Sequence, residues 1–128
     1  MIEVKNVTKK YGSTVAVDDI SFDVKDGEVV GFLGPNGAGK STTMNMITGF
    51  IEPSFGQIII NGKDISKTPK KAKKDIGYMP ENVPLYYELT AKEFVTYMAE
   101  LKMVKRDVRK KQVQEVLKEV GLKRYKIN

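Results

Sequence analysis

The stretch that decides the fold is Gly34-Pro-Asn-Gly-Ala-Gly-Lys-Ser41, with Thr42 directly after it. Its spacing, G-x-x-x-x-G-K-S, matches the pattern of a phosphate-binding loop in full. Glycines at 34, 37 and 39 permit backbone angles closed to other residues, so consecutive amides can point into one concavity. We expect these amides, and the positive end of the following helix, to surround a β-phosphate.

The side chains of this loop have distinct expected roles. Lys40 would reach the β- and γ-phosphates as a point charge, and the Ser41 hydroxyl would ligate Mg²⁺, a hard cation that prefers oxygen ligands. Thr42 is the next donor along, toward the α-phosphate. The predicted ATP-binding residues of the loop are Gly34, Pro35, Asn36, Gly37, Ala38, Gly39, Lys40, Ser41 and Thr42.

The flanks of the loop favour this interpretation over a merely flexible glycine-rich turn. Residues 28–33, Glu-Val-Val-Gly-Phe-Leu, are nearly continuous in apolar side chains, which predicts a central strand covered on both faces. Residues 40–48 predict a helix that ends at Gly49. Strand, loop and helix in this order are typical of an α/β nucleotide-binding core.

Further from the loop, the pattern predicts antiparallel strands. Ile2, Val4 and Val7 begin a strand-like segment, and residues 20–24 alternate between apolar and polar side chains. Asp26-Gly27 predicts a hairpin turn into the next strand. After the helix, we expect short strands at 57–60 and 76–79, and a short helix after Pro69.

The hydrophobic period changes after Leu89. Thr90 and Glu93 form a capping-box pattern, and Phe94, Met98 and Leu101 share one helical face. A second helix is expected at 107–120, with Gly121 at its C-cap. We therefore divide a single incomplete domain into residues 1–86, a β-subdomain with the phosphate-loop core, and residues 87–128, the start of a helical subdomain.

Composition narrows the functional classes. The 128 residues are 41% hydrophobic and 30% charged, as in soluble globular proteins, and they include neither Cys nor His. No window is apolar enough for a spanning helix, and we expect a cytoplasmic protein. The net charge of +6 arises mainly in two basic runs, 67–74 and 102–111, which we interpret as solvated surface. No nucleic-acid partner is expected.

The loop Gly34–Thr42 resembles the form found in ATP-binding cassette (ABC) proteins. The segment Val4–Gly12 is similar to that family's first strand and adenine-stacking loop, which puts Tyr11 at the position of the stacking ring. Residues 16–22 resemble the second strand, and Ala16 takes the small apolar position beside that ring. The resemblance places Asp18-Asp19 in a solvated turn and gives it no metal role.

The segment Ile76-Gly-Tyr-Met-Pro-Glu81 also resembles the family. It is similar to the family's strand and loop that normally end in glutamine. That glutamine joins the Mg²⁺ shell, and here its position is Glu81. A carboxylate is an equally good hard-oxygen ligand, so the predicted metal pair is Ser41 and Glu81. With residues 82–86 after it, this segment resembles exporter-type (ABC-2) cassettes, which pair with a separate permease.

The resemblance implies a P-loop NTPase fold in truncated form: the antiparallel β-subdomain, part of the RecA-like core and the start of the helical subdomain. It also implies an ATPase that couples ATP hydrolysis to transport, as a cassette dimer on a transmembrane permease, peripheral on the cytoplasmic face of the cell membrane. The family's signature motif, acidic strand and switch histidine do not occur in the sequence. We therefore expect a fragment with no catalytic base, which binds nucleotide weakly and does not turn it over.

Three alternatives stay open. A non-transport cassette acting in translation or repair carries tandem cassettes or long insertions, which this sequence does not reveal. A small nucleotide kinase has an arginine-rich lid, whereas the basic runs here are mostly lysine, and it has no role for Tyr11. A nucleic-acid-associated ATPase would bind oligonucleotides with a steep salt dependence, but no aromatic platform accompanies the run 67–74.

Overall fold

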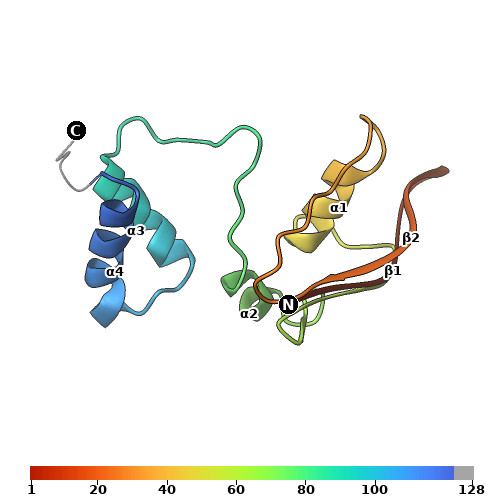
Figure 1. Ribbon diagram of the computed structural model, residues 1–128, viewed down its shortest axis with the longest axis horizontal. Coiled ribbons are helices and arrows are strands. Elements are labelled where there is room, and N and C mark those ends of the chain that lie inside the picture. Colours follow the sequence, from red (N-terminus) through yellow and green to blue (C-terminus); the bar gives the residue numbers. More distant parts are fainter. Residues whose placement is uncertain (123–128) are drawn as a thin grey trace. The chain divides into compact units, whose positions relative to one another are not determined.

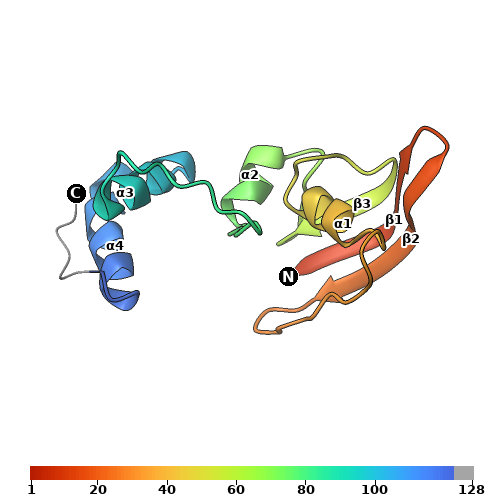
Figure 2. The same ribbon diagram turned by 90° about the horizontal axis from the view of Figure 1, so that it is seen from above.

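Strand β1 (Ile2–Tyr11) lies inside a four-stranded antiparallel sheet. It pairs with β2 (Thr14–Val24) on one side and with β3 (Phe55–Ile60) on the other, and the short β4 (Lys63–Asp64) follows β3 at the edge (Figures 1 and 2). The structure is a computed structural model and describes residues 1–122. The expected antiparallel subdomain is confirmed.

One face of the sheet carries helix α1 (Lys40–Ile47), with the short helix α2 (Pro69–Lys74) beside it (Figures 1 and 2). Alternating apolar side chains of the strands meet the buried side of α1, and burying this apolar surface is the main force that holds the layers together. The core consists of Val4, Val7, Val17, Met46, Ile47, Ile58, Ile60, Ile65 and Ala72.

Two strands expected from the sequence are absent from the described residues. Residues 28–33 and 76–79 have no strand pairing, and Val29 and Leu33 are 100% and 95% exposed. The turn predicted at Asp26-Gly27 does form. Gly27 has a φ of 80°, and the Glu28 amide donates to the Lys25 carbonyl at 3.1 Å. A central strand forms only where neighbouring strands accept its backbone groups. Although the Phe32 ring lies 5.6 Å from the Phe22 ring of β2, no described strand pairs with the backbone of either segment.

The chain divides into two compact units, Met1–Tyr78 and a second unit that begins at Met79. In the second, helix α3 (Ala91–Leu101) packs against α4 (Arg106–Glu119), where Val113 and Leu117 are buried. The boundary expected after residue 86 stays a prediction, and residues 123–128 of the expected helical part lie outside the described residues.

The capping box before α3 is confirmed. The Thr90 hydroxyl accepts from the Glu93 amide at 3.1 Å, and the Glu93 carboxylate accepts from the Thr90 amide at 3.2 Å. At the other end of the pair, Gly121 follows α4 with a φ of 78°, as its C-cap position predicts. No helix within residues 1–122 is both long and apolar enough to cross a membrane.

Candidate functional site

The phosphate-binding loop curves through two left-handed glycines. Gly37 has a φ of 85° and Gly39 a φ of 93°, while the Ala38 amide donates to the Pro35 carbonyl at 3.2 Å. Gly34 differs from the expectation, because its backbone is not left-handed. A Cβ at residue 34 would lie 3.2 Å from the Ala38 Cβ, a tight contact, so the observed reason for glycine there is limited space and not a left-handed backbone.

The N-terminus of α1 opens directly from this loop. Gly39 is the N-cap and no side chain caps it, and the first bond of the helix joins the Thr43 amide to the Gly39 carbonyl at 2.9 Å. The amides of residues 40–42 precede that bond, so they have no acceptor inside the helix. With the positive end of the helix dipole, these amides make a site for an anion.

The cation of this site comes from Lys40. Its ammonium group donates to the carbonyl of Gly34, so the side chain lies back along the loop that it follows. The first turn of α1 contains no acidic residue that would offset this charge. Lysine, amides and helix dipole therefore combine at one end of α1, and their binding of a phosphate group stays a prediction.

The three hydroxyl residues of α1 differ in burial: Ser41 is exposed, Thr42 is half-buried and Thr43 is buried. The hydroxyl of Thr43 donates to the Gly39 carbonyl at 2.8 Å. Thr43 thereby fastens the helix to the loop, a role that the sequence analysis missed. Its signal was the spacing of four residues, because a threonine within a helix commonly bonds the carbonyl one turn before it.

Strand β2 contacts the loop at a β-bulge. Lys9 pairs with Val17 and Lys10 with Val15, so Ala16 lies between them without a partner in the register. A Cβ built on Gly39 would be 2.5 Å from the Ala16 carbonyl oxygen and 3.2 Å from the Val17 Cγ2. Bulges re-aim backbone groups in this way, and this one brings Ala16 against the phosphate-binding loop.

Tyr11 lies at the tip of the same hairpin. It pairs with Thr14, its side chain is 50% exposed, and the Lys9 ammonium is 5.2 Å from the centre of its ring. The hairpin extends past α1 in both views (Figures 1 and 2). An aromatic ring with an exposed face is able to stack on a planar base.

The expected metal pair is divided between the two units. Ser41 belongs to the first unit and exposed Glu81 to the second, so their joint role stays a prediction. Asp18 and Asp19 are exposed, and Asp19 accepts a hydrogen bond from the Asn6 amide group at 3.2 Å within the hairpin. Within residues 1–122, no cluster of three or more acidic side chains could hold a metal ion.

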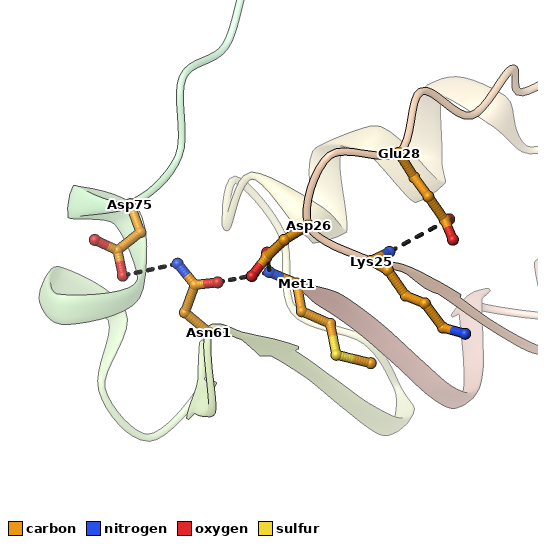
Figure 3. Close-up of polar contacts among 6 residues, drawn as sticks. All are labelled: Met1, Lys25, Asp26, Glu28, Asn61 and Asp75. Carbon is orange, nitrogen blue, oxygen red and sulfur yellow. Dashed lines mark hydrogen bonds and ion pairs between the residues drawn. The ribbon is translucent and has the colours of Figure 1, made fainter.

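A polar network joins the ends of the strands at the start of the sheet (Figure 3). The Met1 amino group lies 2.6 Å from both the Asp26 carboxylate and the Asn61 side-chain oxygen. Lys63 donates to Asp75 at 2.8 Å and Asn61 donates to it at 3.3 Å. These two hydrogen bonds lower the pKa of the Asp75 carboxyl below its ordinary value of 3.8, and the bond from Lys63 has the larger effect.

Known proteins resemble this chain over almost its whole length. The model of a family described as "ABC transporter" matches residues 17–128. The linearmycin resistance ATP-binding protein LnrL of Bacillus subtilis is 43% identical over 95% of this chain and 39% of its own. The probable multidrug ABC transporter ATP-binding protein YbhF of Escherichia coli is 37% identical over 96% of this chain and 21% of its own.

Solved structures give the same result for the fold. An ATP-binding subunit of an ABC transporter superposes with a TM-score of 0.83 at 35% identity, over 96% of this chain and 51% of that one. A dimeric ATP-binding cassette with bound ADP and Pi has a TM-score of 0.74 at 30% identity, over 94% and 57%. The chain thus spans 39% of the Bacillus relative and 51% of the first solved subunit.

Proposed function

The chain belongs to the ABC transporter family, and we propose that it supplies the ATP-binding loop of a transporter's ATPase subunit. The observation that carries this proposal is the geometry of residues 34–42. Two left-handed glycines, the uncapped N-terminus of α1 and Lys40 all meet at one place. That combination of oriented amides and positive charge fits the β- and γ-phosphates of ATP.

We assign the adenine side of the site to the β1–β2 hairpin. The Tyr11 ring is half exposed and free to stack, and Ala16 adds a small side chain where β2 meets the loop. Both residues belong to the same unit as the loop. A base stacked on Tyr11 would therefore extend a nucleotide whose phosphates lie on α1.

We assign the Mg²⁺ that accompanies ATP to the hydroxyl of Ser41 and the carboxylate of Glu81. The fit rests on donor chemistry: Mg²⁺ takes hard oxygen ligands, and Ser41 is exposed next to the lysine of the loop. When bound, the ion neutralises charge on the phosphate oxygens. The chain's own residues would hold the triphosphate and fix its direction.

In the whole protein, we propose that water attacks the γ-phosphate and that the hydrolysis drives transport. Positioning and charge stabilisation supply most of the catalysis in such reactions. The loop amides and Lys40 would contribute both positioning and charge stabilisation, because their positive charge would lie next to the phosphate oxygens that become more negative during the reaction. We assign no general base to any residue of this chain, and we expect the chain alone to bind ATP weakly without turnover.

We propose two partners for the whole protein: a second ATP-binding cassette and a transmembrane permease, with the subunit on the cytoplasmic face of the membrane. The names of the relatives support the transporter role, and a dimeric cassette among the similar structures supports the pairing. The resistance and multidrug relatives favour the exporter type. The transported substrate is a property of the permease.

Binding of ATP labelled on its ribose, with and without Mg²⁺, tests the proposal. We expect Lys40→Ala to abolish binding and Tyr11→Ala to weaken it. Lys25→Ala, which removes an exposed lysine elsewhere in the same unit, should leave it unchanged. Equal affinity of the Lys40→Ala and Lys25→Ala variants would contradict the proposal, provided that circular dichroism shows both to be folded. Multiple-turnover phosphate release that depends on Lys40 would contradict the expected inactivity of the chain alone.

A further inference from the structure

Lys9 holds a defined position beside the Tyr11 ring. Its ammonium group is 5.2 Å from the centre of the ring and donates to the Glu52 carbonyl oxygen at 2.8 Å. Lys9 and Tyr11 are two residues apart on β1, so their side chains rise from the same side of the strand. The cation is thus held between a carbonyl and an aromatic face.

The segment that supplies the carbonyl is itself fastened to β1. The Ser54 amide donates to the Thr8 carbonyl at 2.8 Å, and the Ser54 hydroxyl accepts from the Lys10 amide at 3.0 Å. These bonds hold the chain next to Glu52 at the level of Lys9. Because the acceptor is already in place, only the lysine side chain has to lose conformational freedom when this hydrogen bond forms.

We propose that Lys9 is a positioning residue for the adenine base. Its ammonium group covers one face of the Tyr11 ring through a cation–π contact, which orients the ring and leaves the opposite face for the base. The inference rests on the proposed ATP binding and adds to it the residue that presents the stacking ring. Lys9 also pairs with Val17 of β2, and Val17 lies against Gly39. The lysine beside the Tyr11 ring and the phosphate-binding loop are therefore connected through the same pair of strands.

Lys10 offers a matched control, because it makes the same kind of contact elsewhere. Its ammonium group lies 5.4 Å from the centre of the Phe55 ring, and it is the next residue on the same strand. Lys9→Met and Lys10→Met remove the same charge from adjacent positions of β1, whose side chains lie on opposite faces of the strand. A ligand without a base measures, in each variant, the loss that comes from weaker general attraction to the triphosphate.

The test compares ribose-labelled ATP with inorganic tripolyphosphate, which has no base. A cation–π contact at a partly exposed site is worth about a two- to fivefold change in affinity. We expect Lys9→Met to raise the Kd for ATP by that factor relative to Lys10→Met, once the change in the Kd for tripolyphosphate has been divided out in each variant. Lys9→Arg should restore ATP affinity, because guanidinium also lies well on an aromatic face and donates to a carbonyl.

The Tyr11→Leu background separates this inference from the proposed function. There, Lys9→Met should have no further effect on ATP binding. A tighter ATP complex in Lys9→Met would overturn the inference, because it would mean that the ammonium group occupies the place of the base. An unchanged Kd for ATP in Tyr11→Leu, with binding still lost in Lys40→Ala, would overturn the adenine platform and Lys9's role but leave the phosphate loop intact. Failure of the parent chain to bind either ligand would overturn both proposals.

Discussion

The carbonyl oxygen of Ala16 lies against Gly39, where a Cβ would be only 2.5 Å away from it. The contact joins the unpaired residue of the bulge in β2 to the last glycine of the phosphate-binding loop. Because the two residues belong to different elements, the loop's shape depends on the sheet as well as on its own sequence.

The first prediction is that Gly39→Ala disrupts the loop more than Gly37→Ala. Both glycines are left-handed, and this conformation costs an L-residue about 1–2 kcal/mol. A Cβ at 37 meets nothing within 4 Å, whereas at 39 it would also strike the Ala16 carbonyl, which belongs to a backbone that cannot move aside easily. Urea denaturation should show the larger loss of unfolding free energy for Gly39→Ala. Equal losses in the two variants would mean that the bulge does not touch the loop.

The second prediction concerns the extent of the core. Ile58 is completely buried among the side chains of the sheet and α1, so Ile58→Ala should cost about 2–5 kcal/mol of unfolding free energy. Val29→Ala, in the segment expected as a central strand, removes a fully exposed side chain and should change stability by about 0.5 kcal/mol or less. A large loss for Val29→Ala would show that residues 28–33 are packed in solution.

The third prediction is local to helix α3. Thr90→Ala removes the hydroxyl that accepts from the Glu93 amide, and loss of such a cap costs about 1 kcal/mol. Thr90→Ser keeps the hydroxyl and should retain most of that stability. Hydrogen exchange of the first amides of α3 measures the effect directly. Protection as low in Thr90→Ser as in Thr90→Ala would argue that the threonine methyl group, and not its hydroxyl, stabilises the helix.

The fourth prediction is a loss of stability in acid through Asp75. Hydrogen bonds from Lys63 and Asn61 keep the pKa of this carboxyl in the folded state below its ordinary value of 3.8. A depressed pKa contributes stability that is complete above the unfolded value and is lost as the pH falls below about 4 through the folded value. Asp75→Asn should therefore lower stability at pH 7 and reduce its dependence on pH in this range. Denaturant unfolding of both proteins from pH 7 down to pH 2.5 measures this, and parallel pH curves would contradict the assignment.

Local features were predictable from the sequence alone. The helix expected at 40–48 is α1 at Lys40–Ile47, and the one expected at 107–120 is α4 at Arg106–Glu119. The capping box at Thr90 was read from two residues, because a helix end is decided by groups within one turn of it. The motif at 34–42 likewise predicted its own turn, although Gly34 is not left-handed and has only a tight contact with Ala38 to favour glycine.

Features that depend on distant partners were not predictable in the same way. The apolar run 28–33 has the composition of a central strand, but the described structure has no neighbouring strand to accept its backbone groups. The assignment of Ala16 and Tyr11 to a binding site came from family resemblance and stays a prediction, whereas the contact of Ala16 with the loop became visible only in the structure. The role of Lys9 was missed because it depends on the Glu52 carbonyl, which folding brings near. The role of Thr43 was missed although its acceptor, the Gly39 carbonyl, is only four residues away.

The sequence by itself determined the phosphate-binding loop, the helix after it and the ends of the helices. These depend on the backbone freedom of glycine, on side-chain caps and on the period of apolar residues, all of which act within a few positions along the chain. Only the tertiary structure decided which apolar runs become strands, and that a bulge beside Val17 presses on Gly39. Strand pairing and close packing join residues far apart in the sequence, so they exist only once the partners have met.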